Sequence, residues 1–101
     1  MQAVRIASYT ITDGTFPEIA EEAKSGVLSL LKEQPGFLRY GLAKTGEARC
    51  VSISLWESNA QAEAASLVLA TWVRGHLAGR IELRSTEVGD LAFFEGVPST
   101  V

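Results

Sequence analysis

The hydrophobic positions of this chain recur at every second residue in some segments and at every third or fourth residue in others. Four segments are rich in β-forming residues or alternate apolar with polar, as β-strands do: residues 3–11, 37–43, 51–58 and 80–94. Two segments repeat apolar side chains at helical spacing: residues 16–34 and 59–76. With polar turns at 12–14 and 44–48, the pattern predicts the element order β-α-β-β-α-β.

Local signals indicate where the two helices begin and end. Each begins with a capping box, a hydroxyl residue followed three positions later by Glu or Gln: Thr15 with Glu18, and Ser58 with Gln61. Pro35-Gly36 is expected to end the first helix, and the second is expected to run to about His76. Gly89-Asp90 is expected to bulge or bend the last strand before "LAFF".

This element order predicts an α+β, ferredoxin-like βαββαβ fold, an antiparallel sheet with two helices on one face. We expect a single domain over residues 1–96 and a flexible tail over 97–101. A chain of 101 residues that is 47% hydrophobic has more apolar surface than one small core can bury. Two copies packed sheet against sheet, as a homodimer, would cover the bare face.

The segment "VSISLWES" has two faces that both look like interiors. One row is aliphatic: Val51, Ile53 and Leu55. The other row consists of two hydroxyls and an indole: Ser52, Ser54 and Trp56. We expect the aliphatic row to meet the helices and the second row to lie on the bare face as the wall of a cavity.

The second helix is apolar nearly all round, which indicates burial on more than one side. One stripe is expected to face its own sheet: Ala60, Ala64, Leu67, Val68 and Thr71. A neighbouring stripe carries the single histidine beside an aromatic: Ala65, Leu69, Trp72 and His76. Trp72 fits a core or interface position as well as a ligand contact. For His76, stabilisation by the helix dipole is an alternative to a catalytic role.

Charge and cysteine content exclude several classes of function. The net charge is −3, the pI is near 5.1 and no Lys/Arg cluster is present, which argues against nucleic acid and anionic membrane as partners. A single cysteine, Cys50, forms no internal disulfide, and this favours a cytoplasmic location. No segment has the length of a membrane span, and no spacing of His, Cys or carboxylates suggests a metal site.

Taken together, "QPGFLRYGL", "SLWESNAQAEA" and the ending "GDLAFF" resemble the antibiotic biosynthesis monooxygenase family of dimeric α+β barrel proteins. The resemblance extends from about residue 3 to residue 94. It implies a homodimer with a small aromatic substrate and O2. It also implies no cofactor, since family members that oxidise aromatic polyketides use neither metal, flavin nor nicotinamide.

The resemblance also suggests site residues. The tryptophan at the end of the third strand is matched by Trp56, whereas an asparagine four residues earlier is replaced by Ser52. A tyrosine early in the second helix falls at Ala62, and an arginine late in that helix falls near His76. For the haem-degrading branch, the expected asparagine, tryptophan and histidine fall at Ser8, Ala65 and His76, so only the histidine is retained.

These observations predict a cofactor-independent monooxygenase acting on a planar phenolic or quinonoid compound. His76 would be the base or proton relay, and Trp56 and Ser52 would orient the reacting oxygen. Four further residues are expected to contact the substrate: Ser54, Trp72, Tyr9 and Tyr40. Two alternatives stay open, namely haem binding and breakdown through His76, and a non-catalytic dimeric module that binds a small molecule.

Overall fold

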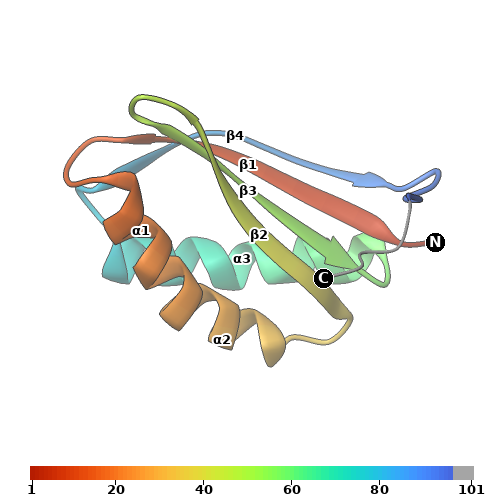
Figure 1. Cartoon of the computed structure of the whole chain (residues 1–101). Coiled ribbons are helices and arrows are strands. Elements are labelled where there is room, and N and C mark those ends of the chain that lie inside the picture. The colour runs from red at the N-terminus through yellow and green to blue at the C-terminus, as the bar shows by residue number, and fades with distance from the viewer. Residues whose placement is uncertain (97–101) are drawn as a thin grey trace.

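A computed structural model describes residues 1–96 and shows one four-stranded antiparallel sheet with its helices on one side (Figure 1). The strands, in the spatial order β2-β3-β1-β4, are β1 (Ala3–Ile11), β2 (Phe37–Gly46), β3 (Arg49–Trp56) and β4 (Ile81–Asp90). The helical segments are α1 (Phe16–Glu22), the π-helix η1 (Ala23–Val27), α2 (Leu28–Lys32) and α3 (Asn59–His76). The predicted ferredoxin-like α+β fold is confirmed. The predicted tail, 97–101, lies outside the described residues.

Both predicted capping boxes are present. The backbone N–H groups of Glu18 and Gln61 donate to the hydroxyls of Thr15 and Ser58. Each hydroxyl in turn donates, at 3.0 Å, to the carboxylate oxygen Oε1 of Glu18 or the amide oxygen Oε1 of Gln61. The first helical region continues from α1 through η1 to α2, so a π-helical turn interrupts what the sequence indicated as one regular helix. Such turns are rare and occur often at functional sites.

The last strand differs from its prediction. It ends at Asp90, so the segment "LAFF" lies outside the sheet. The irregularity expected at Gly89-Asp90 lies instead between Ser8 and Tyr9 of β1, opposite Arg84, which the pairing register skips. The Arg84 guanidinium donates from Nε to Thr10 Oγ1 at 2.7 Å, which gives the extra residue a partner across the strands.

The expected orientation of β3 is wrong. Ser52, Ser54 and Trp56 are 6%, 2% and 0% exposed and face the helices, whereas Ile53 is 40% exposed on the bare face. The reason is size. The inner row also contains the small Ala3 and Ala7 of β1, both fully buried, and small side chains let the helices lie close to the sheet.

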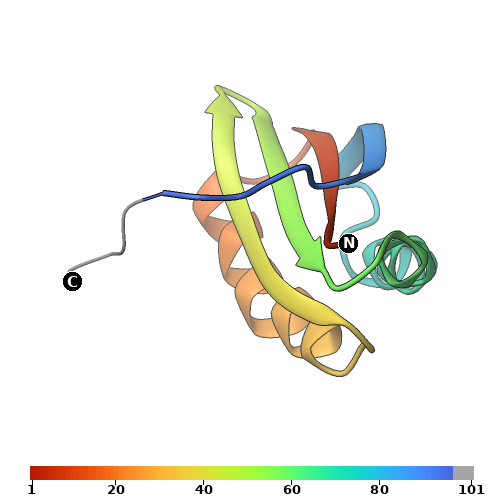
Figure 2. The ribbon, with the colours of Figure 1, turned by 90° about the vertical axis from the view of Figure 1, so that its right-hand side faces the viewer.

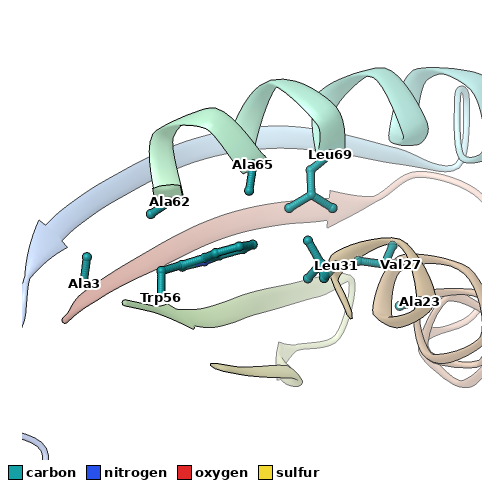
Figure 3. Packing of buried hydrophobic residues seen from close by; sticks show 8 residues of the cluster. All are labelled: Ala3, Ala23, Val27, Leu31, Trp56, Ala62, Ala65 and Leu69. Atoms are coloured by element: carbon teal, nitrogen blue, oxygen red, sulfur yellow. The ribbon is translucent and has the colours of Figure 1, made fainter. Parts of the chain in front are cut away.

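Trp56 fills the space that these small residues leave, and Figure 3 shows its indole between the sheet and α3. Its neighbours in this core come from the sheet and from both helical regions: Ala3, Ala23, Val27, Leu31, Ala62, Ala65 and Leu69. The stripe of α3 expected to face the sheet is therefore wrong, since Leu67 is 74% exposed while Ala65 and Leu69 are buried. Ala65 and Leu69 of the other predicted stripe turn inward, whereas His76 at the end of that stripe is exposed.

The opposite face of the sheet has no helix and carries the aliphatic row. Ile6 of β1 and Ile53 of β3 pair across the two strands and are 36% and 40% exposed. After β4 the chain crosses in front of the sheet toward β2 (Figure 2). There it borders a hollow of about 580 Å³ lined by Leu38, Leu55 and Phe94, among others.

Candidate functional site

A small cavity lies between the sheet and the helices. Its volume is about 30 Å³, enough for one or two water molecules. All four strands contribute to its wall, and so do α1, η1 and α3. Most of the lining is apolar: Ile19, Ala23, Val27, Leu42, Leu69, Val73, Leu77 and Ile81. Because η1 contributes Ala23 and Val27, the π-helical turn helps to shape this wall.

Polar groups reach this cavity only from the sheet. Arg5 and Tyr9 come from β1, Tyr40 from β2, and Cys50 and Ser52 from β3. The pairing register explains their convergence, because Tyr9 lies opposite Cys50, and Arg5 and Tyr40 lie opposite the same residue of β3 from its two sides. A few converging polar groups in an apolar cavity are typical of a small-molecule site.

The protonation state of Tyr40 follows from its surroundings. Burial raises the pKa of Tyr40 well above its ordinary value of 10.0, Tyr9 and Cys50 raise it further, and Arg5 acts in the opposite direction. The phenol is therefore neutral at physiological pH and available as a hydrogen-bond donor. Burial also raises the pKa of the Cys50 thiol, so this cysteine is a poor nucleophile there.

Two open clefts adjoin the cavity and share its residues. One, of about 400 Å³, lies between α3 and β4 and shares Arg5, Tyr9, Val73 and Ile81 with the cavity. The other, of about 260 Å³, lies between the first helical region and β2 and shares Ala23, Tyr40 and Leu42. Ligand sites usually have roughly 300–1,000 Å³. An aromatic ligand therefore fits only if it also occupies a cleft or if side chains of the cavity move.

Trp56 and Ser54 form a closed pair beside the cavity. The indole N–H donates to Ser54 Oγ at 2.9 Å, and Phe37 packs edge-on against the indole at 5.5 Å between ring centroids. Neither Trp56 nor Ser54 is among the residues that line the cavity. The structure thus places Ser52 at the cavity and the other two residues of the row in the packed core.

Trp72 and His76 lie elsewhere, at a cleft of about 350 Å³ between the helices that Glu22, Ser25 and Gly26 also line. Their rings stack with centroids 4.3 Å apart and planes 9° apart. His76 Nδ1 is 2.9 Å from the backbone oxygen of Trp72, which only accepts, so Nδ1 donates and Nε2 is left as the free acceptor of the neutral ring. The structure does not bring His76 together with Ser52 or Trp56.

Sequence analysis missed Arg5 and Cys50 as cavity residues. Arg5 alternates with the aliphatic Val4 and Ile6, and the alternation alone does not indicate which of the two rows faces the helices. A signal was present, because Arg5 shares its row with Ala3 and Ala7, whose small size suits a closely packed inner face.

No helix among residues 1–96 is long and apolar enough to cross a membrane. Within the same range, no three His, Cys, Asp or Glu side chains are grouped so that they could hold a metal ion.

Comparison with known proteins identifies one family. The family model described as antibiotic biosynthesis monooxygenase matches residues 3–66. No curated protein matches the sequence.

Several solved structures share the fold. SnoaB, a cofactor-independent oxygenase from Streptomyces nogalater, is 21% identical with a TM-score of 0.62, and the match covers 97% of this chain and 98% of SnoaB. The haem degrader MhuD from Mycobacterium tuberculosis, with two haems bound in its active site, is 20% identical with a TM-score of 0.69, covering 93% and 99%. MupZ from Pseudomonas fluorescens is 11% identical with a TM-score of 0.70, covering 86% of this chain and 66% of MupZ. The chain thus spans just under two thirds of MupZ. At these identities the likeness shows the fold alone.

Proposed function

We propose that this chain, which belongs to the antibiotic biosynthesis monooxygenase family, oxidises a planar phenolic or quinonoid compound with O2 and without a cofactor. One observation carries the proposal: three hydroxyl groups, those of Tyr9, Tyr40 and Ser52, line a mostly apolar cavity between sheet and helices. The likeness in fold to a cofactor-independent oxygenase supports it. An apolar, water-poor cavity strengthens each hydrogen bond made inside it.

An anthrone illustrates the proposed reaction. Its ring CH2 becomes a carbonyl: both C–H bonds break, one atom of O2 forms the C=O bond, and the other leaves as water with the two hydrogens. The substrate supplies all the electrons. In this scheme the protein binds the flat ring and stabilises the oxyanion that forms on it. Neutral Tyr40 is suited to that task because its raised pKa keeps the donor proton in place.

The remaining predicted site residues take supporting roles in this proposal. Trp56 and Ser54 hold the wall of β3 in place through their buried hydrogen bond. Trp72 and His76 serve a ligand that extends into the cleft between the helices, where Nε2 of His76 is placed to accept a proton.

Oxygen consumption tests the proposal. With a panel of anthrones and naphthols, we expect the native protein to consume O2 and Tyr40→Phe to lower kcat about 100-fold, the usual effect of losing one oxyanion donor. Ser52→Ala should also lower the rate. Ser85→Ala, at an exposed hydroxyl of β4, is the matched control and should leave it unchanged. No uptake across the panel would favour a non-catalytic binding module instead.

Haem binding is a second candidate, and one observation favours it: the free Nε2 of His76 lies at an open cleft. The fold is also that of a haem degrader. Hemin titration tests this candidate. A Soret shift with the native protein that disappears in His76→Ala would support it, and no shift, or an equal shift in both proteins, would reject it.

We also propose that two copies of the chain pack sheet against sheet. The bare face presents Ile6 and Ile53 side by side, and Val4 and Val51, both half-buried, lie on the same face. A contiguous aliphatic surface on a strand pair is typical of an interface. Sedimentation should show a dimer for the native chain and a monomer for Ile53→Lys, with Leu67→Lys on exposed α3 as control. A native monomer would refute the proposal.

A further inference from the structure

Arg5 is a buried cation at the centre of the sheet. Its side chain comes from the inner row of β1, and the residue is only 4% exposed. Removing a guanidinium from water carries a large free-energy cost unless an anion or a full set of hydrogen bonds compensates it. Buried arginines are therefore expected to have a carboxylate partner.

Arg5 has no such partner among residues 1–96. The two ion pairs of this part of the chain are Arg80 with Glu22 and Arg84 with Glu82. The one hydrogen bond that Arg5 makes to another side chain runs from Nε to Ser66 Oγ, at 2.6 Å. Ser66 in turn donates to the backbone oxygen of Ala62 in α3 at 3.2 Å, so the helix holds this hydroxyl in place.

The hydrogen bond to Ser66 leaves the terminal nitrogens of the guanidinium without a protein acceptor. Arg5 lines both the cavity and the cleft between α3 and β4. No side-chain nitrogen or oxygen among residues 1–96 is both fully buried and unpartnered, so these terminal nitrogens are open to water or to a ligand. The two terminal N–H groups of a guanidinium match the two oxygens of a carboxylate or a pair of oxygens on adjacent ring carbons.

The other groups at the cavity reinforce a preference for negative charge. No Asp, Glu or His lines it. Its hydroxyls, Tyr9, Tyr40 and Ser52, can all donate. The adjoining cleft does contain Glu82, which is paired with Arg84, and also Arg74. The cavity thus combines one cation with neutral hydroxyl donors and is lined by no carboxylate or imidazole.

We infer that the ligand of this cavity enters as an anion, an aromatic compound with a carboxylate or an ionised phenol or enol, and that Arg5 binds its charged oxygen. The inference rests on the proposed function in using the same cavity, and it adds the charge state of the substrate. It also accounts for the protons of the anthrone scheme: the first C–H proton is lost to water before the compound enters the site, and the second leaves with the departing oxygen atom as water.

Calorimetric titration with matched pairs of probes tests this assignment. For the carboxylate, the pair is 2-naphthoate and the neutral 2-naphthamide. For the phenolate, it is 2,4-dinitro-1-naphthol, ionised at neutral pH, and its methyl ether. We expect the native protein to prefer the anion in at least one pair. Arg5→Met should weaken binding of that anion about 10- to 100-fold and leave the neutral probe unchanged.

Three further variants separate the assignment from a structural role of Arg5. Arg5→Lys keeps the charge but loses the paired donors, so it should bind the anion with intermediate affinity. Ser66→Ala should weaken anion binding less than Arg5→Met does. Arg74→Met, at an exposed arginine of the adjoining cleft, should have little effect, because its charge is screened by solvent.

Urea unfolding supplies the independent readout. Because Arg5→Met removes an uncompensated charge, it should leave the unfolding midpoint unchanged or raise it. A lower midpoint together with weaker binding of both the neutral and the anionic probe would mean that Arg5 only supports the fold, and would overturn the inference. The inference would also be overturned if the native protein bound neither anion, or if it preferred the neutral member of each pair.

Different results would refute the oxygenase proposal and the anion-site proposal. Arg5-dependent binding of an anion without any O2 uptake would support the anion site and refute the oxygenase. Oxidation of neutral aromatics at equal rates by the native protein and Arg5→Met would support the oxygenase and refute the anion site.

Discussion

Gly26 offers a test of how the two helical regions pack, because the space for its side chain is already occupied. A Cβ built on Gly26 would overlap Cζ2 of Trp72 and would lie 3.0 Å from Cη2 of the same ring. The ring is half-buried and stacked on His76, so it has little freedom to withdraw. Gly26→Ala should therefore displace Trp72 and open the cleft that both residues line.

The magnitude follows from two opposing terms. Replacing a helical glycine by alanine favours the helix by up to about 1 kcal/mol. Overpacking against a ring that is held in place costs about 1–3 kcal/mol. We therefore expect Gly26→Ala to lower the free energy of unfolding by up to about 2 kcal/mol.

Gly75→Ala is the matched control, since Gly75 lies in α3 and a Cβ there would meet nothing within 4 Å. It should be neutral or stabilising by up to about 1 kcal/mol. Urea unfolding followed by circular dichroism gives both values. Fluorescence in a Trp56→Phe background reports on Trp72 alone and should shift in Gly26→Ala. If Gly26→Ala proved as stable as Gly75→Ala, with unchanged fluorescence, the described contact would be refuted.

Three shorter predictions concern the residues around the cavity. Ser54→Ala should lower the free energy of unfolding by about 1–3 kcal/mol in urea melts, since the indole of Trp56 loses its acceptor; unchanged stability would contradict the pair. Above pH 10.0 the native protein should lose stability that Tyr40→Phe retains, because the unfolded chain releases the tyrosine proton first; coinciding stability–pH curves would argue against burial. Cys50 should react slowly with Ellman's reagent until urea unfolds the chain, and rapid native labelling would contradict its burial.

The element order and the helix starts could be predicted because they depend on local patterns. Alternation indicates a strand whichever way it faces, and a capping box acts within four residues, as Thr15 and Ser58 show. The family resemblance, confirmed by the match over residues 3–66, rests on the same local stretches. Strand bounds were less accurate: β2 extends to Gly46, because the turn to β3 is tighter than the polar composition of residues 44–48 indicated.

The facing of the strands could not be predicted from the same patterns. Their hydrophobicity indicated that Val51 and Ile53 face the core. Close packing of the helices instead favours small side chains on the sheet face beneath the helices. Packing of this kind depends on all four strands together. The sequence of one strand alone therefore does not determine which of its two rows of side chains faces the helices. His76 is separated from Ser52 because its ring stacks on Trp72 at the cleft between the helices, whereas Ser52 faces the cavity against the sheet.

The two faces of β3 have different surroundings, so a substitution on one face can be made without changing the other. Ser52 points to the cavity and Ile53 to the bare face, because successive side chains of a strand alternate. A charge at Ile53 would therefore disturb association while leaving the groups around the cavity in place. If Ile53→Lys becomes monomeric and still binds anions through Arg5, each site is complete within one protomer. If anion binding is lost with the dimer, sheet packing holds β1 and β3 in the register that brings Arg5 and Ser52 to one cavity.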